Sequence, residues 1–288
     1  MDKKIIAIIV LTVSVTVGTC SATENAKTCG PDTNLQALQP RQVKADPVDA
    51  VLKQLNNKTL QLKSYQAQLE YKFTQPLLES EAIRKGILYY AKSDKKSKLR
   101  INFQTLKQDD EKQQKYVEDY IVLDGNLLTG ADYKFEGFWL VHINHQIEEI
   151  KYYQLTKPHE PNNPADVFEL ASKKLPLVGF TKTENLKKQF EITLVEQKED
   201  KPTSFIQLHL KVKPNSTYKD DYVSLDFWID KKLGLPTKVV AVSTEEDVYE
   251  IKFLKPKVNK KIDKRLFELK IPKGFGEPEI IPLKKENT

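Results

Sequence analysis

The side chains that could perform catalysis are few, and their spacing does not suit it. His142 and His145 stand close enough in the sequence to be considered as a pair of metal ligands. On an extended strand, however, residues separated by an odd number of positions point to opposite faces, so we expect the two imidazoles not to share a metal ion. His209 alternates with Gln207 and Lys211 and is predicted to face solvent.

Sequence motifs of the familiar enzyme classes are missing as well. The chain contains no G-x-S-x-G nucleophile turn, no H-E-x-x-H zinc helix and no glycine-rich phosphate loop. Its acidic pairs, such as Asp109-Asp110 and Glu245-Glu246, stand in charged turns and are predicted to be solvated. We therefore expect no catalytic residues, no cofactor and no metal, and an enzyme of lipid or cell-wall metabolism is the least favoured class.

Composition places the chain among ordinary soluble globular proteins. Hydrophobic residues make up 39% of its 288 residues and charged residues 30%, and 46 basic against 40 acidic side chains give a net charge of +6. This small excess is spread along the chain, whereas nucleic-acid binding requires a dense basic stripe interleaved with aromatic residues. We expect no nucleic-acid partner, while weak attraction to an anionic membrane surface stays open.

The start of the chain has the pattern of an export signal. Lys3 and Lys4 form a charged beginning, Ile5–Val17 is a short apolar run, and Cys20-Ser21-Ala22 offers small residues for cleavage. The apolar run is too short to span a bilayer comfortably as a permanent helix. The pattern predicts a signal peptide over residues 1–22 and hence an exported protein.

Two interpretations of Cys20 compete. Val17-Gly-Thr-Cys20 resembles the lipobox of bacterial lipoproteins, in which the cysteine is lipidated and becomes the first mature residue. Thr19 fits that pattern poorly, and cleavage after Ala22 is the simpler interpretation. Neither interpretation leaves a disulfide framework or a zinc site, because Cys29 is the only other cysteine of the chain.

The elements that could position a binding site begin after a polar leader. Residues 23–45 are rich in Thr, Gln, Asn and Pro, lack a hydrophobic period and are predicted to be a flexible linker. Asp46 and Pro47 then have the character of an N-cap and a first helical residue. The helix is expected to end near Asn56-Asn57 and to bury an apolar stripe of Val48, Val51, Leu52 and Leu55.

Strict alternation of apolar and polar side chains predicts a long series of strands. Residues 61–74 alternate most sharply, and their apolar face is Tyr65, Ala67, Leu69, Tyr71 and Phe73. Short turns separate the segments, so neighbouring strands are expected to be antiparallel. Further strands are predicted over residues 86–92, 99–106, 116–123, 138–143, 146–155, 191–196, 204–213, 222–230, 238–242 and 248–253.

Turns and helices interrupt this pattern at a few places. Asp124-Gly125 is a strong signal for a tight hairpin. Asn163-Pro164 precedes a second predicted helix over residues 165–174, and residues 183–188 are predicted to form one or two helical turns. Residues 175–180 between them form an apolar loop, and residues 276–288 have the composition of a charged tail.

These elements predict a mainly β, α+β fold. Helices so few cannot cover both sides of a long antiparallel sheet, so we expect them on its one apolar face. A strongly twisted sheet with this many strands should curl. Residues 46–275 are therefore expected to form one half-barrel domain, a curled antiparallel sheet that makes an incomplete barrel with helices packed as a lid on the concave face.

Several short motifs follow one another in a distinctive order. They are Tyr71-Lys-Phe-Thr-Gln75, Gly86-Ile-Leu-Tyr89, Leu99-Arg-Ile-Asn-Phe103, Leu123-Asp-Gly125, Pro176-Leu-Val-Gly-Phe180 with Phe190-Glu-Ile-Thr-Leu194, Ile229-Asp230 with Gly234-Leu-Pro236, and the closing pairs Val258-Asn259, Ile262-Asp263 and Leu266-Phe267 before Pro272-Lys-Gly274. Their order, more than any one motif, resembles a divergent member of the LolA-like family of periplasmic lipoprotein carriers.

The resemblance implies a carrier that holds the acyl chains of lipoproteins or other lipids in an apolar half-barrel and transfers them across the envelope. It also implies an inner-membrane donor complex, an outer-membrane acceptor and a monomeric carrier. Better-known members have an Arg-Pro pair at the end of the second strand, whose arginine helps to hold the lid shut. Lys92-Ser93 stands there in this chain, and lysine lacks the planar fork of arginine. The alternative is a membrane-tethered protein of the same fold, anchored through Cys20, that senses a lipid or an envelope partner.

Residues for the two parts of such a site follow from the predicted faces. Packing in a solid core is the competing interpretation for each of them, because an apolar strand face is most often simply core. The expected lipid lining is Leu69, Tyr71, Phe73, Ile87, Tyr89, Leu99, Ile101, Phe103, Val223, Leu225 and Phe227. The expected lid is Val167, Leu170, Leu177, Val178 and Phe180, with Lys92 as its latch.

Overall fold

The computed structural model describes residues 46–92, 97–112, 116–128, 134–157, 167–172, 183–196 and 204–283. The signal peptide and leader predicted for residues 1–45, with Cys20, lie outside these ranges. The apolar loop at residues 175–180, with the expected lid residues Leu177, Val178 and Phe180, also lies outside them.

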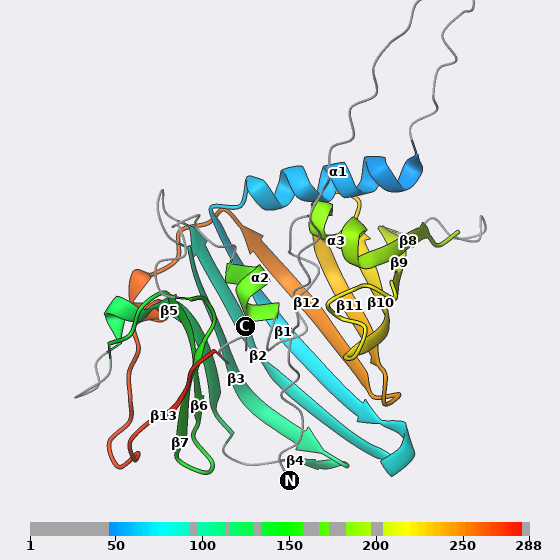
Figure 1. Cartoon of the computed structure of the whole chain (residues 1–288). Helices are drawn as coiled ribbons and strands as arrows, with labels where there is room; N and C mark the ends of the chain where they lie inside the picture. The colour runs from blue at the N-terminus through cyan, green and yellow to red at the C-terminus, as the bar shows by residue number, and fades with distance from the viewer. Residues whose placement is uncertain are drawn as a thin grey trace, which may run out of the picture.

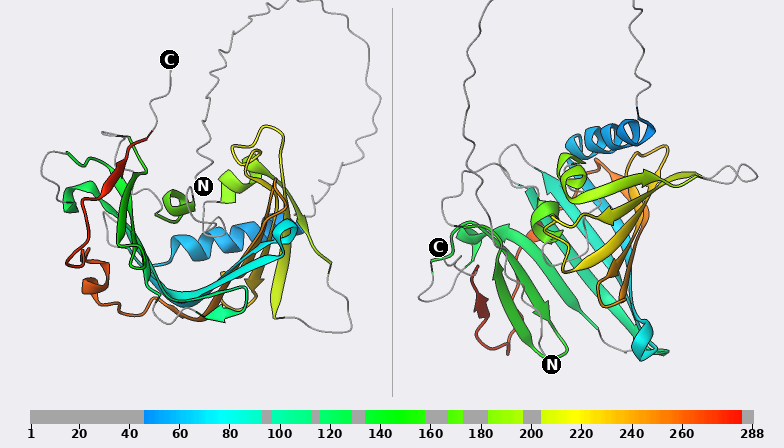
Figure 2. Two further views of the ribbon diagram at one scale, coloured as in Figure 1. Left: turned by 90° about the horizontal axis from the view of Figure 1, so that it is seen from below. Right: turned by 45° about the vertical axis from the view of Figure 1, so that its right-hand side comes forward.

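The described strands form one open sheet that curls into a half-barrel (Figures 1 and 2). Its order is β13-β7-β6-β5-β3-β2-β1-β12-β11-β10-β9-β8, with β4 added to β3, and neighbours are antiparallel except for β13 and β7. Within the described residues β13 and β8 end the order without pairing with each other, so the barrel is incomplete and the predicted fold class is confirmed. The strands are β1 (Ser64–Gln75), β2 (Ser80–Lys92), β3 (Ser97–Gln108), β4 (Glu111–Lys112), β5 (Glu118–Asp124), β6 (Phe138–Asn144), β7 (Glu149–Gln154), β8 (Phe190–Leu194), β9 (Phe205–Val212), β10 (Tyr222–Asp230), β11 (Pro236–Ser243), β12 (Val248–Val258) and β13 (Glu279–Ile281).

The sheet curves around α1 (Pro47–Leu60) and α2 (Val167–Ser172), as the left view of Figure 2 shows. A third helix, α3 (Thr183–Gln189), leads directly into β8, and its Leu186 joins the same hydrophobic core. The helices therefore cover the concave side, as the count of helices against strands predicted. Among the described residues, no helix is both long and apolar enough to cross a membrane.

Helix α1 begins where the sequence predicts and continues one turn further. The Asp46 carboxylate accepts a hydrogen bond from the backbone N–H of Val48 at 3.0 Å, which satisfies one of the donors that every helix start leaves open. Leu52 and Leu55 are buried against the sheet. The helix runs through the two asparagines to Leu60 because tertiary packing outweighs their low helix propensity.

Replacing Asp46 by alanine is expected to lower the free energy of unfolding by about 1 kcal/mol, because the Val48 N–H loses its acceptor at the helix start. Urea denaturation followed by circular dichroism measures the loss. Asp46→Asn keeps a capping side chain and is expected to cost a few tenths of a kcal/mol at most; equal losses for the two variants would contradict the capping role.

The convex face of the central strands is polar and carries a ladder of ion pairs. Glu70 on β1 pairs with Lys85 on β2 at 2.8 Å and with Lys252 on β12 at 3.0 Å. The ladder continues from Lys252 to Glu250 at 2.8 Å and from Glu250 to Lys238 on β11 at 2.6 Å. The hydrogen bonds from Lys85 and Lys252 lower the pKa of Glu70. Such partly exposed pairs stabilise the fold only weakly, but they mark this face as the wetted one.

At β5, β6 and β7 the convex face is apolar instead, which departs from the expectation of one wet face along the whole sheet. The C-terminal strap, defined as residues 264–281, covers this region and begins with the short 3-10 helix η4 (Lys264–Phe267). Its strand β13 lies in the segment that was expected to be a charged tail. The reason is that the unbroken apolar runs in β5 and β6 bury both faces. The covered cluster is Ile121, Leu123, Leu128, Phe135, Trp139, Val141, Ile143, Ile150 and Tyr152, with Leu269, Phe275 and Ile280 packed on it.

Asp124-Gly125 does not form the predicted two-residue hairpin. It begins a 3-10 turn, η2 (Gly125–Leu127), in which the Asp124 carboxylate accepts a hydrogen bond from the Asn126 N–H at 3.0 Å. β5 and β6 are still antiparallel neighbours, but the chain returns to β6 only at Phe138. The same Asp-Gly chemistry that favours a tight hairpin also favours capping of a turn, and here the longer connection uses it as a cap.

Candidate functional site

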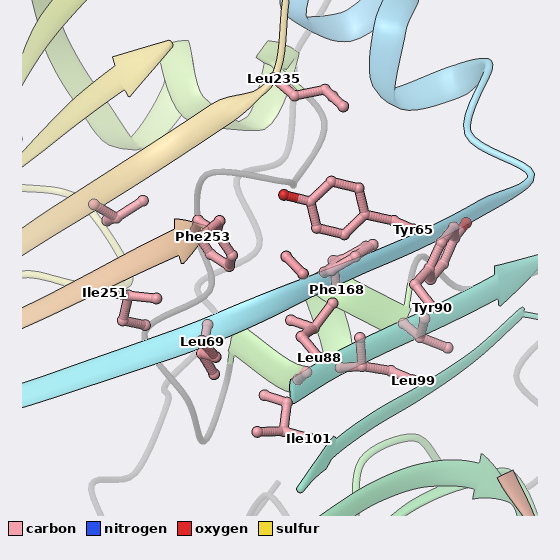
Figure 3. Close-up of a cluster of buried hydrophobic side chains, with 14 of the residues drawn as sticks. Tyr65, Leu69, Leu88, Tyr90, Leu99, Ile101, Phe168, Leu235, Ile251 and Phe253 are labelled. Atoms are coloured by element: carbon pink, nitrogen blue, oxygen red, sulfur yellow. The ribbon is translucent and has the colours of Figure 1, made fainter. Parts of the chain in front are cut away.

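The concave face of the half-barrel is a continuous apolar surface. Strand register places Leu69 opposite Phe253, and Leu88 opposite Ile101 and Ala67. Figure 3 shows side chains from β1, β2, β3, β12 and α2 converging on this surface. Of the expected lining residues, the structure places these on the concave face: Leu69, Tyr71, Phe73, Leu99, Ile101, Phe103, Leu225 and Phe227.

Ile87 and Tyr89 lie on the opposite, convex face, so the structure does not bring them to the expected lining. Ile87 stands opposite Gln68, and Tyr89 stands opposite Gln66. In this stretch of β2 the even-numbered and the odd-numbered positions both carry apolar side chains. Alternation alone therefore does not decide which side chains point inward. The hydrogen-bond register with β1 decides it, and Leu88 and Tyr90 take the inward positions.

Val223 also does not line the concave face as expected. A β-bulge at the start of β10 shifts the register between Tyr222 and Ser224. The bulge reverses the alternation at its own position. Tyr222 therefore packs against the concave core, while Val223 is 51% exposed.

Helix α2 supplies the described part of the expected lid. Val167 and Leu170 are buried in the concave core, together with Phe168, which sequence analysis did not select. The Phe168 ring lies 4.7 Å from the ring of Tyr90, centroid to centroid. Lys92, the expected latch, is exposed at the end of β2, and no contact with α2 within the described residues supports that role.

Burial changes along the concave face from one end to the other. At the closed end, beneath α1 and α2, Tyr65 and Leu88 are 0% exposed. At the open end, towards the β1–β2 turn, Tyr71, Phe73 and Tyr249 are only partly buried. Phe73 and Tyr249 stack with their ring centroids 5.0 Å apart. The face is thus enclosed at one end and bordered by aromatic rings at the other.

A polar cluster interrupts this apolar face beside the open end. It consists of Arg84 on β2, Tyr116 before β5, Glu118 and Tyr120 on β5, and His142 on β6. Glu118 is 4% exposed and accepts hydrogen bonds from the Tyr120 hydroxyl at 2.8 Å, from the Tyr116 hydroxyl and from His142 Nε2 at 2.8 Å. Arg84 Nε completes the shell at 3.3 Å from the same carboxylate. An ionised carboxylate can only accept, so the two tyrosine hydroxyls and His142 Nε2 donate to it, while Arg84 forms an ion pair with it.

The polar cluster keeps Glu118 ionised. Burial by itself would raise the pKa of this carboxyl group, but the hydrogen bonds from His142, Tyr116 and Tyr120 and the charge of Arg84 together lower the pKa to about 2. Sequence analysis missed the cluster, and its partners come from three strands. The available signal was a charged or polar side chain at an inward position of an alternating strand.

Acid is expected to remove the stabilisation that the polar cluster provides. The pKa of Glu118 is about 2 in the folded chain against an ordinary value of 4.5, so its contribution is complete above pH 4.5 and is lost as the pH falls through 2. The full contribution is about 3 kcal/mol. We therefore expect the difference in free energy of unfolding between the wild type and Glu118→Gln to shrink between pH 5 and pH 2. The exposed Glu79→Gln variant supplies the baseline, and a difference independent of pH would contradict the prediction.

His142 and His145 point to opposite faces, as their spacing predicts. His142 binds Glu118 on the concave face, whereas His145 lies on the convex face 3.7 Å from Asp119. Asp119 also accepts hydrogen bonds from Arg100 at 2.9 Å and from Asn102 at 2.8 Å, and Arg100 in turn donates to the Leu266 carbonyl of the C-terminal strap at 2.9 Å. Asp119 and Arg100 on the convex face therefore hold the C-terminal strap against the sheet.

These features define a class of protein: an open half-barrel whose apolar concave face is covered by short helices. No protein-family model matches the chain, and no curated protein matches its sequence. Among solved structures, an uncharacterized conserved protein from Thermus thermophilus matches at 9% identity over 82% of this chain and 99% of that chain, with a TM-score of 0.44.

LolA-like proteins, the family that the sequence motifs resemble, are among the other structures matched. A domain described as an outer membrane lipoprotein-sorting protein from Vibrio parahaemolyticus has 9% identity, covers 76% of this chain and 94% of its own, and has a TM-score of 0.36. A LolA superfamily protein from Nitrosomonas europaea has 11% identity, covers 75% and 96%, and has a TM-score of 0.31. At these identities and scores the likeness concerns the overall fold alone.

Proposed function

We propose that this chain is an exported carrier that binds the acyl chains of lipoproteins or other lipids on the concave face of its half-barrel. The observation that supports the proposal is the change of burial along that face. The end beneath α1 and α2 is closed, while Tyr71, Phe73 and Tyr249 leave the other end partly exposed. These partly exposed aromatic rings pack on the edge of the core and provide apolar surface that an entering acyl chain would cover.

Energetics explain why a carrier needs a surface of this kind. Each buried methylene group is worth about 0.8 kcal/mol, so one acyl chain of ordinary length represents roughly 10 kcal/mol of hydrophobic free energy. Helix α2 has 6 residues, so moving it aside uncovers a limited area. The incoming acyl chain would cover the same area again, and loading and release would then differ little in free energy.

The proposal includes export to the periplasm, loading from an inner-membrane donor complex and unloading to an outer-membrane acceptor by a monomeric carrier. Cleavage after Ala22 would produce the soluble carrier, whereas lipidation of Cys20 would produce a tethered binding protein of the same fold. Growth with labelled palmitate distinguishes them: an unlabelled chain that begins at Thr23 supports the soluble carrier, and label on Cys20 supports the tethered protein.

Native mass spectrometry of protein purified from its own cell envelope tests the binding itself. We expect mass adducts that dissociate as lipids or as an acylated protein. The extracted protein should then bind dioleoyl lipids that are added back. Protein that arrives empty and stays empty in the presence of added lipid would contradict the proposal.

A further inference from the structure

Arg84 is the arginine of the polar cluster on the concave face. It stands opposite Tyr71 on β1 and Leu106 on β3, and its side chain is 29% exposed. Its guanidinium carbon lies 5.8 Å from the centre of the Tyr71 ring. A charge this deeply placed is retained only where it has a partner or a task, because removing it from water costs several kcal/mol.

The protein itself uses one side of this guanidinium group. Nε donates to the Tyr116 hydroxyl at 2.9 Å and lies 3.3 Å from Glu118. Within the described part of the chain, the terminal nitrogens Nη1 and Nη2 donate no hydrogen bond. The oxygens of Glu118 receive Tyr116, Tyr120 and His142, and neither terminal nitrogen of Arg84 donates to them.

We propose that the Nη1 and Nη2 groups of Arg84 bind the phosphate of a lipid head group whose acyl chains lie along the concave face towards α1. The proposal rests on the proposed function and names the chemical class of its ligand. A guanidinium group held through Nε presents its two outer nitrogens in the planar fork that matches phosphate oxygens. Glu118 and Tyr116 act as positioning residues, because they hold the fork in one orientation.

The position of Arg84 agrees with the polarity that such a lipid requires. Arg84 lies in the partly exposed stretch of the face, level with Tyr71, and the closed apolar end begins beyond it at Leu88 and Tyr90. A lipid that enters from the open end with its chains first would bring its phosphate to the level of Arg84. The Tyr71 ring beside the guanidinium group would lie between the phosphate head group and the acyl chains of the lipid.

The test compares two lipids with the same acyl chains, dioleoyl phosphatidic acid and dioleoylglycerol, titrated onto the full chain by native mass spectrometry. We expect the wild type to bind the phosphatidic acid about tenfold more tightly, the effect of a charge-assisted pair. Arg84→Gln should bind both lipids equally, at the affinity of the wild type for dioleoylglycerol. Lys85→Gln, which alters the next residue on the convex face, should keep the tenfold preference.

Each other outcome has a definite meaning. A wild type that binds both lipids equally, or Arg84→Gln that keeps the preference, overturns the head-group site and leaves the carrier function standing. A wild type that binds neither lipid overturns both. Inorganic phosphate at millimolar concentration should not bind without lipid; if it does, Arg84 belongs to a free-anion site and the proposal fails. Arg84→Lys keeps the charge without the fork and is measured alongside, and if Arg84→Gln does not fold, an undiminished preference in Arg84→Lys overturns the proposal.

Discussion

Valine in place of Gly86 is expected to prevent the half-barrel from folding or to lower its free energy of unfolding by more than about 3 kcal/mol. A Cβ atom at this position would lie 2.1 Å from the Asn102 carbonyl oxygen and 2.7 Å from the Phe103 Cα on the neighbouring strand. Both atoms belong to the backbone of β3, which cannot move away as a flexible side chain would. The register between β2 and β3 shifts at this glycine, which is why the backbones approach so closely.

Urea denaturation of Gly86→Val and of a matched control decides this prediction. Gly276 offers the control, because a Cβ atom there would meet nothing within 4 Å. We expect Gly276→Ala to change the free energy of unfolding by less than about 0.5 kcal/mol. A Gly86→Val protein that unfolds at the wild-type urea concentration would show that β2 and β3 are not paired in this register.

Replacing the stacked pair Phe73 and Tyr249 by asparagine is expected to weaken the binding of an acyl chain about 100-fold. A fully covered aromatic side chain contributes about 1.5–3 kcal/mol. Because both rings are already partly buried in the free protein, about 1.4 kcal/mol from each is left for the ligand, and the loss of two corresponds to that factor. Stability should suffer less than binding, because both residues are partly exposed in the free protein and only the ligand would cover them completely. Titration of a dioleoyl lipid by native mass spectrometry measures the affinity, and thermal unfolding checks the fold.

The matched control for that variant is the double change Ile87→Asn and Tyr89→Asn. These residues have similar partial burial and were expected from sequence to line the site, but they face outward. We expect this control to bind lipid as the wild type does. Loss of binding in the control, with binding retained in the Phe73 and Tyr249 variant, would place the site on the convex face and refute the proposed function.

Local chemistry determined much of this protein from its sequence alone. Within the segment predicted at residues 61–74, every apolar side chain from Ser64 onward stands at an odd-numbered position. The pattern therefore predicted both the strand and its inward face, and Tyr65, Ala67 and Leu69 are buried there. Asp46 and Pro47 predicted the start of α1 because capping involves only neighbouring residues. The open, curled sheet with its helices on one side followed from the count of strands against helices.

Tertiary structure decided what depends on register and on distant segments. Pairing with β1 places Leu88 inward and Ile87 outward, and a bulge in β10 places Val223 outward. Where both alternating sets of positions are apolar, the hydrogen-bond register decides which set faces the core. The C-terminal strap covers β5 to β7 through contacts between segments that lie far apart in the chain. The polar cluster has the same origin: Arg84, Glu118 and His142 come from three strands, and only the register of those strands in the folded sheet places the three side chains around one buried carboxylate.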